Sequence, residues 1–178
     1  SDPVIWQDDS YDGKRVVFSV CNDLACTGAR PAGLLLTALL PVDIQEIQIR
    51  TMVKKIAEEC EPMGIQILGG HTEITPAVNR PVISVTGVGK TKEQKLIPSG
   101  GAKAGDDILV TKWIGLEGTF RIARRKEEEL AVRYPLYMIR EAASYDRYLS
   151  VLPEAEIAVE EGVHSMHDIS EGGIFGAL

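Results

Sequence analysis

Apolar and polar residues follow one another in blocks whose spacing predicts a mixture of strands and helices. The leucine-rich run over residues 33–40 is typical of a buried strand. The alternation of apolar and polar residues over 82–88 predicts a second strand with one partly solvated face. Residues 1–5 are typical of the end of a further strand, and 65–68 form another short apolar run. The pattern in the first half of the chain therefore predicts a sheet.

The clearest predicted helix covers residues 43–60. Asp43 with Glu46 three residues later is the pattern of a capping box, and Pro62 and Gly64 end the helix. Its apolar residues recur at near-helical spacing and predict the buried face: Ile44, Ile47, Val53, Ile56, Ala57 and Cys60. Before it, we expect a loop over 7–14 and a short helix of small residues that stops before Pro31.

The second half predicts helices and strands in turn. We expect strands at 108–112 and 163–169, and helices at 119–130, 134–149 and 153–161. Residues 91–105 are rich in Lys, Gly, Pro and Ser and lack periodicity, so they are the best candidate for a domain boundary. The overall fold class is α/β, with an α+β second part.

A pair of glycines between two apolar runs is the most conspicuous local motif, Gly69-Gly70-His71-Thr72-Glu73. Two residues without a Cβ allow a sharp turn and a close approach of a ligand to the backbone. The imidazole, hydroxyl and carboxylate that follow suit an anionic, metal-bound ligand. An ordinary strand-to-loop turn with exposed polar residues is the alternative that this motif leaves open.

The composition of the chain excludes some classes of binding partner. The chain has 178 residues, a net charge of −7 and a pI of about 5.0, which argues against nucleic acid or an anionic membrane as the main partner. No apolar run reaches the ~20 residues of a membrane span. The odd count and spacing of Cys21, Cys26 and Cys60 fit no zinc or redox motif, so we expect reduced, mostly buried thiols in a cytoplasmic protein.

One motif is a near match only. Residues 84–91 resemble a phosphate-binding P-loop at Gly89-Lys90-Thr91, but Ser84 stands where that motif needs glycine. A P-loop also needs a helix directly after it, whereas residues 92–95 are short and precede Pro98. We therefore expect no P-loop.

Polar clusters at the ends of predicted elements are the candidate site: Asp2, Asn22-Asp23, His71-Thr72-Glu73 and His167-Asp168-Ser170-Glu171. Carboxylates suit hard cations, each bridging to a polyphosphate. The alternatives are a helix cap for Asp23 and hydrogen-bonded structural imidazoles for His71 and His167. The glycines at 172–173 suit either a phosphate or a simple helix cap.

These motifs together resemble the aminoimidazole ribonucleotide synthetase superfamily. The similarity lies in Ser1-Asp2-Pro3, Cys21-Asn22-Asp23-Leu24-Ala25 with Gly28-Ala29-Arg30-Pro31, Gly69 to Glu73, Val85-Thr86-Gly87, Gly105-Asp106-Asp107 and His167 to Gly173. The motifs occur in the family's order and span nearly the whole chain. That superfamily also holds the HypE-type hydrogenase maturation protein, thiamine monophosphate kinase and selenophosphate synthetase.

The resemblance implies a fold and a ligand. Residues 1–98 correspond to an N-terminal domain, without its first glycine-rich segment, whose sheet forms a barrel-like homodimer. Residues 99–178 correspond to the beginning of a truncated α+β C-terminal domain. ATP lies between the domains, with Mg²⁺ on Asp2 and Asp23. The expected nucleotide contacts are Asn22, Gly69, Gly70, His71, Thr72, Glu73, Asp168, Ser170 and Glu171. No residue is assigned to catalysis.

The expected function is that of an ATP- and Mg²⁺-dependent enzyme that activates an amide or carbamoyl-type group through a phosphorylated intermediate. The segment over 22–31 and the second glycine pair are most similar to the hydrogenase-maturation branch. The glycine turn with His71 is instead similar to that of the selenophosphate enzymes. A small-molecule kinase or selenophosphate-type phosphotransferase, a non-catalytic nucleotide-binding dimeric scaffold, and a structural fragment that binds nothing are the alternatives.

Overall fold

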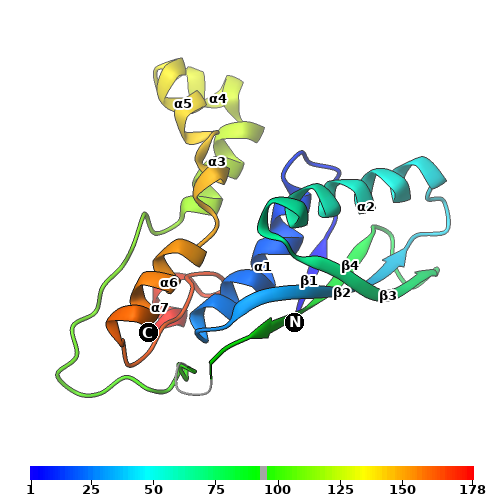
Figure 1. Ribbon diagram of the computed structural model, residues 1–178. Coiled ribbons are helices and arrows are strands. Elements are labelled where there is room, and N and C mark those ends of the chain that lie inside the picture. The colour runs from blue at the N-terminus through cyan, green and yellow to red at the C-terminus, as the bar shows by residue number, and fades with distance from the viewer. Residues whose placement is uncertain (93–95) are drawn as a thin grey trace.

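A four-stranded mixed sheet organises the first half of the protein (Figure 1). The computed structural model describes residues 1–92 and 96–178. The strand order is β1 (Asp2–Ile5), β4 (Val82–Lys90), β2 (Arg30–Leu40) and β3 (Gln66–Ile74). β1 and β2 both run antiparallel to β4, whereas β2 and β3 are parallel. The strands predicted at 33–40 and 82–88 are confirmed as β2 and β4, and the mixed α/β fold class is confirmed.

Two helices, α1 (Asp12–Cys26) and α2 (Glu46–Cys60), cover one face of this sheet (Figure 1). Alternate residues of β2 and β4, such as Leu34 and Val85, point into the layer between them and are fully buried. The opposite face carries exposed side chains, including Leu35 and Val88. The buried cluster is formed by Val4, Trp6, Val16, Val17, Val20, Cys21, Leu34, Leu40, Met52, Ile56, Cys60, Ile65, Ile83 and Val85.

The loop predicted over 7–14 is confirmed only for residues 7–11, because α1 begins at Asp12. α1 is one long helix that ends at Cys26, instead of the short helix expected before Pro31. The buried carboxylate of Asp12 accepts hydrogen bonds from the backbone N–H groups of Gln7 (2.8 Å) and Asp9 (2.9 Å) and pairs with Arg15 (3.2 Å). This network anchors the chain at the start of the helix, and the apolar residues from Val16 onward continue it at helical spacing.

The predicted helix at 43–60 is confirmed as α2, but its details differ. The capping box is formed by Gln45 and Gln48 instead of Asp43 and Glu46. The buried stripe contains Met52, Ile56 and Cys60, while Ile47 and Val53 are 64% and 51% exposed. A stripe spaced by four residues faces the sheet, so apolar residues off that line remain on the solvent side.

The glycine pair does not form a turn. Gly69 to Glu73 continues β3, where each residue pairs with a residue of β2. A bulge at Leu68 precedes the pair, and Gly69 and Gly70 have φ values of 145° and 148°, which disfavour any residue with a Cβ. A Cβ on Gly70 would lie 1.7 Å from the carbonyl oxygen of Leu36. The glycines therefore let β3 approach β2 closely.

The second half is helical and irregular. It contains α3 (Leu116–Arg125), α4 (Glu127–Ala131), α5 (Leu136–Ala142), α6 (Leu152–Glu161) and α7 (Gly173–Ala177), with a short 3₁₀ turn at Tyr145–Tyr148. A second 3₁₀ turn, Glu61–Met63, follows α2 in the first half. The helix predicted at 119–130 breaks at Lys126 into α3 and α4, and only parts of 134–149 are helical. Among the described residues, no helix is long and apolar enough to cross a membrane.

The strands predicted at 108–112 and 163–169 were wrong. Both stretches are irregular, and no strand in the described part of the chain pairs with either. Leu109 is 86% exposed, so the apolar pattern there is not a sign of burial. Three residues of the predicted boundary at 91–105, 93–95, lie outside the described residues. The expectation of no P-loop at 84–91 agrees with β4, since residues 82–90 form one strand.

The backbone of Gly70 offers a direct test of β3 pairing. Gly70→Ala should destabilise the protein by roughly 3 kcal/mol, because the added Cβ meets backbone atoms of Leu36 and the φ value is unfavourable. Gly69→Ala meets no atom within 4 Å and should cost about 1 kcal/mol from backbone strain alone. Urea unfolding measures both values, and equal losses in the two variants would contradict this account.

Candidate functional site

The candidate site lies where the C-terminal end of α1 meets the first strand and residue 168. Asp23 lies in the last turn of α1. Asp2 opens β1 at the edge of the sheet, two residues before the buried Val4, so its side chain is on the helix-covered face. The helix and the strand therefore deliver two carboxylates toward the same region, although they are 21 positions apart in the sequence.

Asp168 completes this group from the second half of the protein. Its side chain is only 10% exposed, and the ring of its neighbour His167 donates to the Asp168 carbonyl at 2.6 Å. The pKa of Asp23 is raised to about 6 by partial burial first, then by the negative charges of Asp168 and Asp2 and a side-chain hydrogen bond to Asp168, while the terminal amino group opposes this rise. We call Asp2, Asp23 and Asp168 the acidic triad.

A thiol lies beside the acidic triad. Burial raises the pKa of Cys26 to about 12, and the charges of Asp168 and Asp23 contribute to that rise. Burial likewise raises the pKa of Cys21 to about 12 and that of Cys60 to about 11. All three cysteines are free, and Cys21 and Cys60 belong to the core, as the sequence predicted.

The segments that flank the acidic triad are tied to α1 and to each other. The backbone N–H of Ile97 donates to the carbonyl of Thr27, the residue that follows α1 (3.0 Å). The ring of His164 bonds to the carboxylate of Asp106 at 2.9 Å, and the hydroxyl of Ser165 donates to the carbonyl of Ser99 at 2.7 Å. These bonds hold the stretch that leads to Asp168 against the end of α1.

Asn22, which we expected to contact the nucleotide, binds the backbone of the second half of the protein. Its side-chain N–H donates to the carbonyl of Leu149 (2.9 Å), and its side-chain oxygen accepts from the N–H of Val151 (3.0 Å). Both polar atoms of the amide therefore bind the backbone that precedes α6.

Gly69 to Glu73 lies away from the acidic triad. Asp2 pairs with Val85, which pairs with Leu36, which pairs with Gly70, so Asp2 and Gly70 are at opposite edges of the sheet. Three strand spacings amount to about 14 Å. His71 and Glu73 are exposed and approach each other at 3.7 Å. Within one chain, the predicted site is thus divided into two regions.

The remaining predicted residues follow Asp168. Ser170 and Glu171 are exposed, and the Ser170 carbonyl accepts from the N–H of Gly173, where α7 begins. Among residues 1–92 and 96–178, no group of three or more His, Cys, Asp or Glu side chains is arranged to hold a metal ion by itself. A cation at the acidic triad would therefore need ligand atoms from outside the protein.

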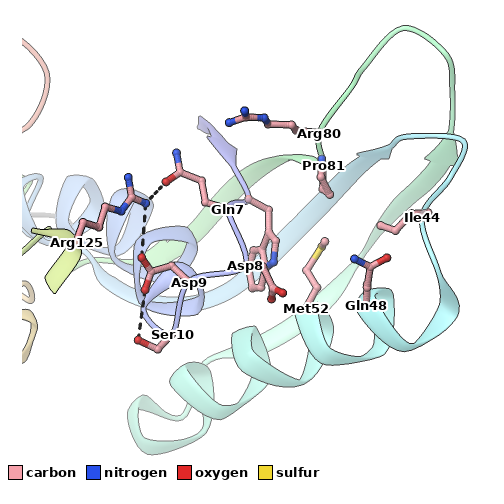
Figure 2. Close-up of a pocket in the computed structure, with 11 residues that line it drawn as sticks. Gln7, Asp8, Asp9, Ser10, Ile44, Gln48, Met52, Arg80, Pro81 and Arg125 are labelled. Atoms are coloured by element: carbon pink, nitrogen blue, oxygen red, sulfur yellow. Dashed lines mark hydrogen bonds and ion pairs between the residues drawn. The ribbon is translucent and has the colours of Figure 1, made fainter.

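A cavity of about 800 Å³ lies at the other end of α1, away from all predicted site residues (Figure 2). Gln48 and Met52 of α2 face Pro81 and Arg80 across it, and Arg125 bonds to Gln7 and to Asp9 (3.5 Å). The cavity is a product of the loop that the buried Asp12 anchors. It carries an ion pair that is already satisfied, and none of the acidic triad lines it.

Sequence reasoning missed two carboxylates that organise the structure, Asp12 and Asp146. Asp146 accepts from Lys14 and from Arg124, both at 2.7 Å. Asp12 precedes an apolar run at helical spacing, a pattern that would have revealed it as the start of a helix. No sequence signal connects Asp146 with Lys14, because the two are 132 positions apart.

A family model supports this architecture. The model described as AIR synthase related protein, N-terminal domain, matches residues 2–91, just over half of the chain. The chain belongs to the AIR synthase-related family.

Relatives within this family carry several activities in their names. Carbamoyl dehydratase HypE of Rhodobacter capsulatus is 27% identical over 168 residues, which are 93% of this chain and 47% of that protein. Selenide, water dikinase of Paraburkholderia xenovorans is 26% identical over 95% of this chain and 46% of that protein. The chain spans about half the length of the curated relatives it matches.

Among solved structures, the hydrogenase maturation protein HypE in complex with ATP has the same fold. It superposes with a TM-score of 0.75 over 99% of this chain and 52% of that chain, at 22% sequence identity. This AIR synthase-related fold includes the second half of the protein as well as the sheet.

The acidic triad predicts a pH-dependent stability. Because the pKa of Asp23 is about 6 in the folded state and ~3.9 in an unfolded chain, the folded state binds more protons between these values. The free energy of unfolding should therefore fall as pH rises from about 4 to 6 and then level off. Asp23→Asn should remove this loss and be more stable at pH 7 by on the order of 1 kcal/mol after allowance for solvent screening.

Urea unfolding of Asp23→Asn and the unmodified protein at pH 4, 5, 6 and 7 measures this difference. Asp43→Asn, in the turn between β2 and α2, is the matched control and should keep the original pH profile. Parallel profiles for Asp23→Asn and the unmodified protein would contradict the raised pKa of Asp23.

Proposed function

We propose that this protein is an ATP- and Mg²⁺-dependent enzyme that activates an amide or carbamoyl-type group by phosphorylation. The observation that carries the proposal is the acidic triad: separate elements bring three carboxylates together where burial and mutual repulsion raise the pKa of Asp23. Such crowding is costly unless a cation compensates it. Membership of the AIR synthase-related family and the ATP complex of a HypE structure support this reading.

The residues present fit magnesium. Mg²⁺ usually keeps several waters and binds one or two carboxylates together with the phosphates of its substrate, so it needs no complete protein cage. Asp2 and Asp23, which the sequence predicts as metal ligands, would hold it, with Asp168 as a further carboxylate beside Asp23. Bound there, Mg²⁺ would neutralise the charge that develops on the transferred phosphoryl group.

The protein's own contribution is placement and charge. The end of α1 fixes Asp23, the edge of the sheet fixes Asp2, and the low exposure of Asp168 reduces its contact with water. Catalysis of phosphoryl transfer depends mainly on positioning and electrostatic stabilisation, so rigid elements suit this role. Ser170 and Glu171, exposed beside Asp168, are proposed to contact the nucleotide.

Two classes of substrate could accept the phosphoryl group, and each corresponds to a different reaction. A carbamoyl-type acceptor and a role in hydrogenase maturation follow the relative named carbamoyl dehydratase. The alternative, a phosphotransferase such as a small-molecule kinase or a selenophosphate synthetase, follows the relative named selenide, water dikinase. Release of phosphate in the presence of a carbamoylated thiol peptide, compared with selenide, distinguishes the two classes.

A second copy of the chain is the proposed partner, in a cytoplasmic homodimer. All nine residues of the edge strand β3 are exposed, among them Ile67 and Ile74, and the uncovered face of the sheet adds Leu35 and Val88. Residues 69–73 lie on this same edge, so we propose that they contact nucleotide from a dimer surface. Residues 1–98 and 99–178 are proposed as the two domains.

Asp23→Asn should weaken Mg²⁺-dependent ATP binding and abolish turnover. Loss of one charged ligand should weaken binding about 100-fold, which corresponds to ~2.7 kcal/mol. Calorimetry with ATP and Mg²⁺ and an assay of phosphate release measure the two quantities, with Asp43→Asn as the control. Near-normal turnover in Asp23→Asn would overturn the proposal, and binding without any turnover in the unmodified protein would favour the scaffold alternative.

The proposed dimer surface can be tested by a substitution on the uncovered face of the sheet. Leu35→Glu places a charge on the uncovered face of the sheet and should convert the dimer to a monomer without unfolding it, because Leu35 is 41% exposed in the single chain. Val132→Glu, at a residue of the second half that is 84% exposed, is the matched control. Light scattering coupled to size exclusion gives the mass, and a dimeric Leu35→Glu variant would argue against this surface.

A further inference from the structure

One segment of the second half runs along α1 and is attached to it at two points. We call residues 143–152, which connect α5 to α6, the strap. Near the start of α1, Lys14 pairs with Asp146 of the strap at 2.7 Å. Near the end of α1, Asn22 binds the backbone of Leu149 and Val151. The two attachments are eight residues apart on α1, about 12 Å along the helix.

The attachment through Asp146 is shared with α3. The Arg124 guanidinium donates to Asp146 at 2.7 Å and to the carbonyl of Ala143, the first residue of the strap, also at 2.7 Å. The Asp146 side chain is only 14% exposed, so solvent screens this network weakly. Ion pairs therefore hold the start of the strap against α1 and α3.

The other attachment depends on the amide of Asn22. An amide supplies a donor and an acceptor from one rigid group, and here both atoms are used on one stretch of backbone. Asp23 is the next residue along the helix, and neighbouring residues on a helix face different directions. One turn of α1 thus holds the strap with one residue and presents a carboxylate of the acidic triad with the next.

The strap leads directly into α6, the helix that precedes the irregular stretch with Asp168. Leu152 at its end packs against the core cluster, and α6 begins there. Lys112 pairs with Glu154 in the first turn of α6 at 2.9 Å. From the end of α6, a short irregular stretch reaches Asp168. The strap and α6 therefore fix one end of the stretch that reaches Asp168, and the bonds of His164 and Ser165 fix its middle.

We infer that Asn22 is a positioning residue: it fastens the strap to α1 so that Asp168 stands opposite Asp23, and it makes no contact with the nucleotide. The inference rests on the proposed function for the role of the two carboxylates. The attachment of the strap to α1 is independent of that function, because it is present in the protein without ligand.

The test compares Asn22→Ala with Ser19→Ala. Ser19 lies on the same helix, and its hydroxyl donates to the carbonyl of Val16 without reaching the strap, so its loss is a matched control. Asn22→Ala should raise the amide hydrogen-exchange rate of Val151 and of residues 163–172 by about 10-fold. It should also raise the Mn²⁺ concentration for half-maximal binding, measured by electron paramagnetic resonance, by about 10-fold.

At saturating Mn²⁺ and ATP, turnover by Asn22→Ala should stay within about 2-fold of the unmodified protein. A variant that merely folds less well would lose maximal turnover without a change in the Mn²⁺ midpoint, and that outcome overturns the inference. Asp146→Asn, which loosens the other attachment, should change exchange in the same direction and keeps the test available if Asn22→Ala does not fold.

Two further outcomes overturn the inference. The first is unchanged exchange at Val151 and at 163–172 in Asn22→Ala. The second is weakened ATP binding with unchanged exchange and an unchanged Mn²⁺ midpoint, since that is the behaviour of a nucleotide ligand. If the unmodified protein binds neither Mn²⁺ nor ATP, the proposed function fails, and the exchange rates of 163–172 alone decide the inference.

Discussion

Crowding of partly buried carboxylates is the feature on which the proposed chemistry of this protein depends. Asp2, Asp23 and Asp168 arrive from a strand, a helix and an irregular segment, and partial burial, with the charges of Asp168 and Asp2, raises the pKa of Asp23 to about 6. A folded protein tolerates such a cost when something else compensates it, and sites of this kind are often functional. A divalent cation with a polyphosphate is the compensating ligand whose chemistry matches these oxygen donors.

Helix α1 is the element that connects this site to the rest of the fold. Its apolar side packs on the sheet, its start is anchored by the buried Asp12, and its last turn carries both Asn22 and Asp23. The second half of the protein attaches to the same helix through Lys14 and Asn22. One rigid helix therefore sets the relation between the sheet, the strap and the acidic triad.

Local patterns in the sequence were sufficient to predict a helix or strand where one face of that element is buried. The leucine-rich β2, the alternating β4 and the amphipathic α2 all follow from periodicity. The glycine pair at 69–70 was misleading, since adjacent glycines are typical of turns, and only pairing with the distant β2 makes them part of a strand. The strand predicted at the apolar stretch 108–112 was wrong for the opposite reason. This stretch has no strand to pair with in the described structure.

The nearness of some predicted residues followed from the sequence, while their role stays a prediction. Carboxylates at element ends and the family resemblance singled out Asp2, Asp23 and Asp168, and the charges of Asp168 and Asp2 act on Asp23 in the fold. The same reasoning placed residues 69–73 beside them, whereas the sheet order puts that segment at the far edge. The hydrogen bonds of Asn22 had no signal in the sequence, because its partners Leu149 and Val151 are 127 and 129 positions away.

The most direct measurement is a titration of the Asp23 carboxyl carbon by nuclear magnetic resonance, without and with Mg²⁺ and a non-hydrolysable ATP analogue. The account predicts a pKa of about 6 without ligand and a fall of at least about one unit when the ligands bind, because a cation favours the charged carboxylate. An ordinary pKa near 4 that does not respond to Mg²⁺ and nucleotide would contradict it.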